Sequence, residues 1–212
     1  MSFDCLTCTA IYGKIIKTTA FQGDSNEKKN HKKLLAESFL ELAQTKRIDK
    51  ITITEITNNC GMSQPTFYNH FKDKYDMIVW IYTNHVREIM CRIDNKTFLW
   101  KDCLLGAALY YSENSEFIKN ALKHTSGQDS FVENVRRINT AALKAEVQKH
   151  LMTEYIPDET MRMIKFYAYG LVQFMLEWLL GDMNFSPEQV AEIWDKSLPE
   201  PLKQYLYPTE NN

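Results

Sequence analysis

The chain has 212 residues and a mass of 24.9 kDa, so it is long enough to bury a hydrophobic core in one or two domains. Its content of 44% hydrophobic and 25% charged residues is ordinary for a soluble globular protein. Only 7 glycines, 6 prolines and few alternating runs of β-branched residues argue against a sheet-rich fold, and we predict an all-α protein with long helices.

The net charge of −2 is unevenly distributed along the chain. Residues 26–80 carry nine Lys or Arg against seven Asp or Glu, a surplus of two positive charges. Residues 81–212 carry fourteen against eighteen, a deficit of four, and residues 1–25 carry two of each. Because phosphate binding depends on local charge, the negative total does not exclude a nucleic-acid partner for residues 26–80.

The first 25 residues show no clear helical period, and we interpret 1–25 as an N-terminal extension. Cys5 and Cys8 have the spacing of zinc ligands, but no second pair of Cys or His completes a set of four. The five cysteines also form no even set for disulfides. We therefore expect reduced thiols, no metal, no cofactor, no signal peptide and a cytoplasmic location.

The first predicted helix runs from Asn30 to about Gln44 and is amphipathic. Basic side chains precede it or lie in its first turn, where positive charge opposes the helix dipole. A nearby polyanion would account for them, and a solvated basic face is the alternative. The apolar face contains Leu34, Leu35, Phe39, Leu42 and Ala43.

A second helix is predicted after Thr52, which is a good N-cap. Ile51, Ile53, Ile56 and Cys60 have the spacing of one apolar helix face, and Cys60 is interpreted as a core residue.

A tight turn then leads into a third helix. Gly61 supplies the left-handed residue that ends the second helix, and Met62 fills the turn. Ser63 is a second N-cap, followed by Pro65 in the first turn, where its missing N–H does no harm.

The third helix has two faces. Phe67 and Phe71 lie four residues apart and point toward the second helix, whereas the outer face is polar and aromatic. Two short helices joined by a glycine turn, the second with such an outer face, describe a helix-turn-helix.

The segment TITEITNNCGMSQPTFYNHFKDKYD resembles the DNA-binding signature of TetR-type transcriptional regulators. The resemblance runs from Asn30 to about Tyr75, with a departure at Pro65, where Gly is common. It implies a three-helix DNA-binding domain over residues 26–75. The implied DNA-binding residues are Thr52, Ser63, Gln64, Pro65, Thr66, Tyr68, Asn69, His70 and Lys74.

The resemblance also divides the work among these residues. Thr52, Tyr68, His70 and Lys74 are expected to hold phosphates, while Gln64, Pro65, Thr66 and Asn69 are expected to lie nearest to base edges. Gln64 is the best candidate for reading an adenine, because its amide can pair with that base through two hydrogen bonds.

The rest of the chain, residues 76–212, is expected to form a helical regulatory and dimerisation domain. A long helix from Lys74 carries apolar residues at helical spacing, and the resemblance implies that it joins the DNA-binding head to the body. Turn signals separate further predicted helices at 97–113, 115–124, 129–151, 158–180 and 187–197.

Two segments of the body, SENSEFIKNALKHTSGQDSF and YAYGLVQFMLEWLLGDMNFSPEQVAEIW, resemble the regulatory domain of the TetR subgroup that includes the dihydroxyacetone-kinase regulators. The resemblance implies a homodimer in which the last two long helices of each subunit pair. The residues Met163–Leu180 are apolar nearly all round, which favours a buried helix over a membrane span. The expected dimer residues are Phe166, Gly170, Gln173, Glu177 and Trp194.

A small-molecule site inside the body is a further possibility, although aromatics at helical spacing usually belong to a core. The candidates are Trp100, Tyr111, His124, Asn139, Tyr167, Gln173 and Trp178.

The sequence therefore predicts a sequence-specific DNA-binding regulator that binds a palindromic operator as a homodimer, controlled by a small-molecule effector or a partner protein. The alternatives are a helical protein-interaction module and a transcriptional co-activator that acts with a partner protein. We expect no membrane partner and no enzyme activity, because the five histidines share no metal spacing and neither a G-x-S-x-G motif nor a phosphate loop occurs.

Overall fold

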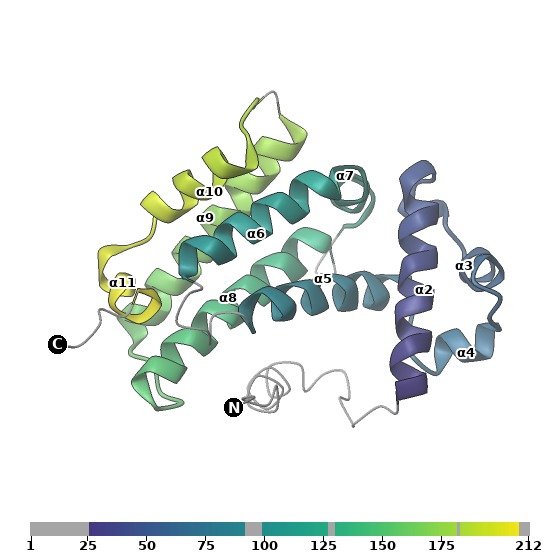
Figure 1. Ribbon diagram of the computed structural model, residues 1–212, viewed down its shortest axis with the longest axis horizontal. Coiled ribbons are helices and arrows are strands. Elements are labelled where there is room, and N and C mark those ends of the chain that lie inside the picture. The colour runs from purple at the N-terminus through teal and green to yellow at the C-terminus, as the bar shows by residue number, and fades with distance from the viewer. Residues whose placement is uncertain (1–25, 92–98, 127–129, 182, 208–212) are drawn as a thin grey trace. The chain divides into compact units, whose positions relative to one another are not determined.

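The computed structural model describes residues 26–91, 99–126, 130–181 and 183–207 (Figure 1). Ten α-helices and one short 3-10 helix, with no strand, make up this described part, which confirms the predicted all-α fold. The helices are α2 (Asn26–Thr45), η1 (Ile48–Lys50), α3 (Ile53–Asn59), α4 (Gln64–Tyr68), α5 (Lys74–Met90), α6 (Trp100–Glu113), α7 (Ser115–His124), α8 (Phe131–Leu151), α9 (Asp158–Leu180), α10 (Pro187–Lys196) and α11 (Glu200–Leu206).

Most predicted helices lie within a few residues of the observed ones, but two short helices were not predicted. The 3-10 helix η1 lies between the first and second predicted helices, and α11 follows Pro199 and has Pro201 in its first turn. Two prolines suggest a helix breaker, but proline is tolerated in a first turn, where its N–H is not needed. The N-terminal extension, with Cys5 and Cys8, lies outside the described residues.

The described chain divides into two compact units. Of the described residues, 26–84, 114–126 and 130–134 form the head unit, and 85–91, 99–113, 135–181 and 183–207 form the body unit. The sequence placed the end of the DNA-binding domain at residue 75. In the structure α7, which comes much later in the chain, belongs to the same unit as α2, α3 and α4.

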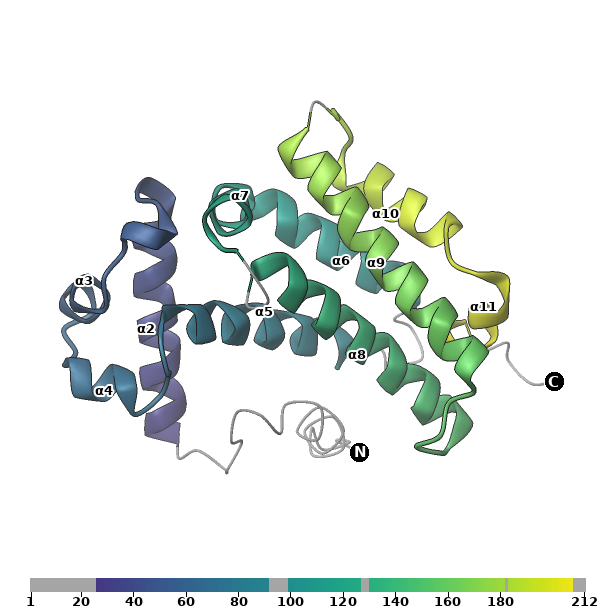
Figure 2. The same cartoon turned by 180° about the vertical axis from the view of Figure 1, so that it is seen from behind.

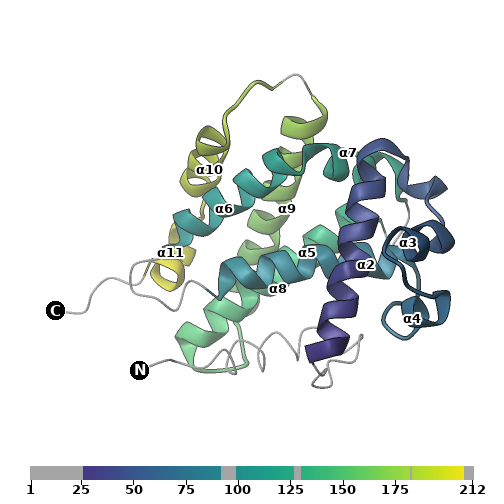
Figure 3. The ribbon, with the colours of Figure 1, turned by 45° about the vertical axis from the view of Figure 1, so that its right-hand side comes forward.

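In the head unit, α2 packs against α3, α4 and α7 (Figure 3). Phe67 is fully buried, and the centroid of its ring lies 5.7 Å from the ring centroid of Phe71. On α7, Phe117 meets Phe39 edge to face at 6.1 Å. Truncating a core phenylalanine to alanine costs about 3–5 kcal/mol, so these rings are major stabilising contacts.

The buried face of α2 differs slightly from the predicted one. Leu34 was expected in the core but is 38% exposed, whereas Ser38 is buried. The Ser38 hydroxyl donates a hydrogen bond to the Ile56 carbonyl at 2.8 Å. Because α2 packs against both α3 and α7, its buried surface is displaced from Leu34 toward Ser38.

In the body unit α6 lies beside α10, and α11 packs against α9 (Figures 1 and 2). One side of α9 is buried, including Ile164, Tyr167 and Met175. Its other side is exposed, with Phe166 at 81% and Tyr169 at 44%. Among the described residues of a single chain, therefore, this apolar helix is covered on one side only.

Candidate nucleic-acid interface

The start of α3 is fixed by side-chain caps, as the sequence predicted. Thr52 has extended backbone angles, φ −100° and ψ 155°, and its hydroxyl oxygen accepts a hydrogen bond from the Glu55 N–H at 3.2 Å. The Glu55 carboxylate accepts from the Thr52 N–H at 2.9 Å, which completes a capping box. A seven-residue helix needs such caps, because helix nucleation is unfavourable in isolation.

The Glu55 carboxylate also accepts a hydrogen bond from Lys46, at the end of α2. This bond, together with those from Thr52, lowers the pKa of Glu55 to about 2. The capping box therefore stays charged at any physiological pH, which suits its place at the positive end of a helix.

The turn between α3 and α4 has the predicted glycine conformation. Gly61 has φ +68°, in the left-handed region, and the Met62 N–H donates to the Thr57 carbonyl at 2.8 Å. Asn59 fastens this end of α3 to α2, because its amide donates to Ser38 at 3.1 Å and to Glu41 at 3.0 Å.

The start of α4 is also capped from within. The Ser63 hydroxyl oxygen accepts from the Thr66 N–H at 3.3 Å. The Gln64 amide nitrogen donates to the Thr54 hydroxyl at 2.8 Å, which joins the first turn of α4 to the first turn of α3. The five-residue α4 is therefore held at a defined angle by its cap, by Gln64 and by the buried Phe67.

The predicted DNA-binding side chains, Lys74 included, are exposed or half-buried. Tyr68 is 56% exposed, and His70 is half-buried with its ring 5.9 Å from the ring of His31. The remaining exposed or half-buried residues of this set are Thr52, Ser63, Gln64, Pro65, Thr66, Asn69 and Lys74. The head unit thus presents polar and aromatic groups around a short, rigidly held helix.

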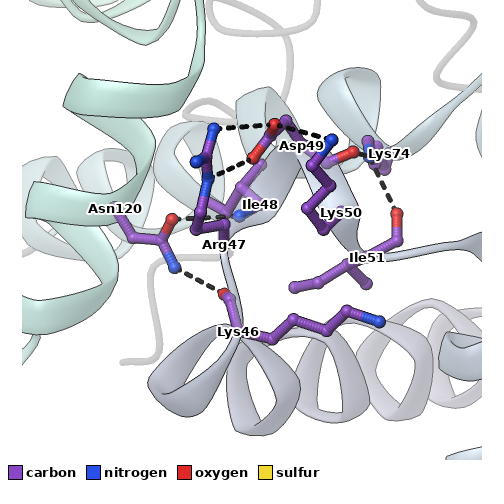
Figure 4. Close-up of polar contacts among 8 residues, drawn as sticks. All are labelled: Lys46, Arg47, Ile48, Asp49, Lys50, Ile51, Lys74 and Asn120. Atoms are coloured by element: carbon purple, nitrogen blue, oxygen red, sulfur yellow. Dashed lines mark hydrogen bonds and ion pairs between the residues drawn. The ribbon is translucent and has the colours of Figure 1, made fainter.

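Lys74 has contacts that the sequence did not reveal. Its ammonium group donates hydrogen bonds to the Asp49 carbonyl at 3.0 Å and the Ile51 carbonyl at 2.8 Å (Figure 4). Burial lowers the pKa of this ammonium from its ordinary value. Lys74 therefore stabilises the turn between α2 and α3, and a phosphate contact by the same group remains a prediction.

Three of the predicted ligand-binding residues come together in the body unit around Trp194. The Tyr167 hydroxyl donates to the Trp194 carbonyl at 2.8 Å and accepts from the Trp100 indole N–H at 3.5 Å. Tyr111 lies edge to face with Trp194 at 6.3 Å between ring centroids. The indole nitrogen of Trp194 is buried and has no hydrogen-bond partner among the described residues.

The other predicted ligand-binding residues are placed elsewhere. His124 belongs to the head unit, and Asn139 is half-buried on α8. Gln173 is exposed and donates to Glu177 at 3.1 Å, and the Trp178 indole donates to the Phe185 carbonyl at 3.0 Å.

Four of the five predicted dimer residues share the exposed side of α9: Phe166, Gly170, Gln173 and Glu177. A methyl group added to Gly170 would meet no atom of the described residues within 4 Å. Trp194 is different, because it is only 4% exposed and contacts Tyr111 and Tyr167 inside the body unit. Its side chain is therefore part of the subunit core and not of the exposed face.

Comparison with known proteins agrees with this arrangement. A protein-family model described as "Bacterial regulatory proteins, tetR family" matches residues 40–79, and one described as "Transcriptional regulator C-terminal region" matches residues 99–199. A relative, the HTH-type dhaKLM operon transcriptional activator DhaS of Lactococcus lactis subsp. lactis (strain IL1403), is 29% identical over 86 residues. That match covers 40% of this chain and 45% of the relative, less than half of its length.

Solved structures show the same fold. The dihydroxyacetone kinase operon activator DhaS is similar with a TM-score of 0.58 at 19% identity, over 83% of this chain and 98% of that one. A TetR transcriptional regulator from Rhodococcus sp. RHA1 is similar with a TM-score of 0.59 at 14% identity, over 82% and 99% of the two chains.

The capped helix-turn-helix and the all-helical body define the class of helix-turn-helix regulatory proteins. Within that class, the chain belongs to the TetR family of bacterial regulatory proteins. The members of this family are transcription factors, which agrees with the expectation that the chain is not an enzyme. No helix in the described ranges is long and apolar enough to cross a membrane.

Proposed function

We propose that the chain is a transcriptional regulator that binds a palindromic DNA operator as a homodimer. The observation that carries this proposal is the short helix α4, whose exposed Gln64, Pro65, Tyr68 and Asn69 stand on a doubly capped helix-turn-helix. A recognition helix in the major groove needs such a surface on a rigid support.

The hydrogen bond of Gln64 favours a role in base reading. Its amide nitrogen uses one N–H to reach Thr54, which leaves a second N–H and the amide oxygen available. Those two groups are what an adenine edge requires in the major groove. The bond to Thr54 holds the side chain in one orientation before DNA binds, which reduces the entropy cost of the contact.

The exposed side of α9 supports the homodimer. Phe166, Tyr169 and Leu180 are 81%, 44% and 44% exposed on one helix, and Gly170 leaves room for close approach. Large apolar side chains gathered on one face mark an interaction surface. In a two-fold symmetric pairing the same face serves both subunits, which would present two heads to two half-sites about one helical turn apart.

The cluster around Trp194 supports a small-molecule effector site in the body unit. A buried indole N–H without a partner costs about 1–3 kcal/mol, and a ligand with a hydrogen-bond acceptor would remove that cost. Trp100, Tyr111 and Tyr167 supply the apolar surroundings that such sites have. Control by a partner protein is the alternative, and the relatives named as activators of a dihydroxyacetone kinase operon make dihydroxyacetone the first compound to test.

Selection from a random duplex library tests the DNA-binding proposal. We expect enrichment of a palindrome, and affinity that falls about a thousandfold between about 50 and about 200 mM salt as phosphate contacts are screened. A failure to enrich any sequence would favour the protein-interaction alternative.

Operator binding with and without dihydroxyacetone tests the control step. A response by the purified wild type that is lost in Trp194→Phe, which has no indole N–H, would support the internal site. A response that requires cell extract would instead favour a partner protein.

A further inference from the structure

The turn between α2 and α3, residues 46–51, decides where α3 begins. It contains η1, and its main-chain bonds are Lys50 N–H to the Arg47 carbonyl at 2.9 Å and Ile51 N–H to the Ile48 carbonyl at 3.2 Å. Ile48 and Ile51 are fully buried. Because Thr52, the N-cap of α3, follows directly, any movement of this turn moves the start of the helix-turn-helix.

One amide from α7 holds this turn on the side of α2. The Asn120 amide nitrogen donates to the Ala43 carbonyl at 2.9 Å. The same nitrogen donates to the Lys46 carbonyl at 2.7 Å, and the amide oxygen accepts from the Ile48 N–H at 3.0 Å (Figure 4). Carbonyls at the C-terminal end of a helix lack partners within the helix. A primary amide, with two N–H donors and one oxygen, satisfies all three main-chain groups at once.

Lys74 holds the next part of the same turn through the Asp49 and Ile51 carbonyls. The turn is therefore held by two side chains, one from α7 and one from the start of α5, which follows the helix-turn-helix directly (Figure 4). Asn120 is 72 residues from Ile48 in sequence and lies in the region matched by the C-terminal family model, outside residues 40–79 of the DNA-binding family model.

We propose that Asn120 is a positioning residue of the DNA-binding site, and that α7 is a functional part of the head. Asn120 fixes the turn 46–51 and thereby the orientation of α3, so that Thr52 and α4 meet the DNA together. This inference rests on the proposed DNA-binding function. It also means that a change in α7 reaches α3 through this turn.

The test compares Asn120→Ala with the wild type in the full-length protein, at a temperature where both are fully folded. We expect the operator dissociation constant to rise about tenfold, because three hydrogen bonds to the turn are lost. We also expect the slope of log affinity against log salt to fall by about one, because misplacement of Thr52 removes a phosphate contact. A residue that only stabilises the fold would lower the melting temperature but leave the salt slope of the folded protein unchanged.

Two further variants separate hydrogen bonding from packing. Asn120→Asp has the same shape and keeps an acceptor for the Ile48 N–H, but its carboxylate faces the Ala43 and Lys46 carbonyls. It should therefore bind operator at least as poorly as Asn120→Ala. Lys119→Ala is the matched control on α7, because Lys119 pairs with Glu116 of the same helix, and it should bind like the wild type.

If the Asn120 variants do not fold, amide hydrogen exchange of the wild-type protein tests the inference instead. In the wild type the Ile48 amide should be protected, and operator DNA should slow its exchange further. The inference is overturned if Asn120→Ala binds with wild-type affinity and salt slope, or if DNA leaves the Ile48 amide unaffected. If the wild type binds no duplex, the proposed function itself fails, while protection of the Ile48 amide still reports on the Asn120 contact.

Discussion

The helix-turn-helix of the head and the long helix α9 of the body are stabilised in different ways. In the head, α3 and α4 have only seven and five residues, and each begins with a side-chain cap, from Thr52 and Ser63. In the body, α9 has 23 residues and follows Pro157 without a side-chain cap. Short helices depend on caps because nucleation is costly, whereas a long helix is stabilised by the apolar face that it buries.

Because of this difference, we expect the two regions to respond to different substitutions. The geometry of the head rests on a few local hydrogen bonds, so single polar or glycine changes should alter its function. The exposed face of α9 is apolar and open, so a charge placed there should affect association and leave the fold intact.

The largest effect is expected for Gly170→Glu on α9. The single chain has space for the side chain, since nothing lies within 4 Å of the added carbon. In a symmetric dimer the new carboxylate would be buried without a partner, which costs about 3–5 kcal/mol. Light scattering should show monomers, and operator binding should be lost.

Lys144→Glu, at an exposed position on α8, is the matched control and should remain dimeric. A wild-type protein that is a stable monomer at micromolar concentration would remove the basis of this prediction.

The next largest effect, on the stability of the fold, is expected for a substitution of Gly61 in the head. Its φ of +68° is strained for any residue with a side chain, although no atom obstructs one. Gly61→Ala should therefore lower the free energy of unfolding by about 1–2 kcal/mol through backbone strain alone, as measured by urea denaturation.

Gly106→Ala, within α6, is the comparison in the body. There the added carbon makes only an ordinary contact with Ile89 at 3.6 Å, and the change should stabilise the helix by up to about 1 kcal/mol. Equal effects at the two sites would show that the turn conformation is not what restricts Gly61.

Within the head, Lys74→Ala and Gln64→Ala should separate positioning from base reading. Lys74→Ala should weaken binding to all sequences and reduce the salt slope by about one, and should also release the Asp49 and Ile51 carbonyls. Gln64→Ala should relax preference at one base pair, at a cost of about 1–3 kcal/mol. If both variants changed sequence preference equally in a binding-site selection, this division would be wrong.

The smallest effect concerns pH and the capping box of α3. The folded pKa of Glu55 is lowered to about 2 from an ordinary value of 4.5, so its stabilising contribution is present above pH 4.5 and is lost as the pH falls toward 2. In Glu55→Gln this contribution is absent at every pH. The melting temperatures of the two proteins should therefore converge between pH 4.5 and pH 2.

Glu188→Gln, at the start of α10, provides the comparison in the body. A hydrogen bond from Ser186 lowers the pKa of Glu188 as well, much as Thr52 acts on Glu55, but no lysine contributes to the shift of Glu188 as Lys46 does for Glu55. The convergence should be smaller for this variant. A larger convergence of the melting temperatures for Glu188→Gln would mean that the charge of Glu55 does not contribute more to stability than that of Glu188.

Much of the helical architecture was predictable because its signals are local. Thr52, Ser63 and Gly61 act on groups within three or four residues, and all three have the predicted backbone conformation or cap. The short helix α11, which starts after Pro199, and the three-residue η1 were not predicted, because such short helices show no clear hydrophobic period.

The roles of several side chains were not predictable, because they depend on which helices pack together. Leu34 was expected to be buried but is exposed. Because α2 packs against both α3 and α7, its buried face includes Ser38 and not Leu34. Trp194 was expected in the dimer interface but packs against Tyr111 in the core of the body unit. Helical periodicity shows that a residue lies on an apolar face, but not whether its neighbour is the same chain or a second copy.

The sequence by itself determined the all-α class, the caps and turn of the helix-turn-helix, and the exposed residues of α4. Only the tertiary structure decided that Lys74 and Asn120 hold the turn between α2 and α3, because their partners lie 23 to 77 residues away. A cap acts across one helical turn, so the residues that form it lie close together in the sequence. A hydrogen bond between distant segments exists only once packing has brought the donor within about 3 Å of its acceptor.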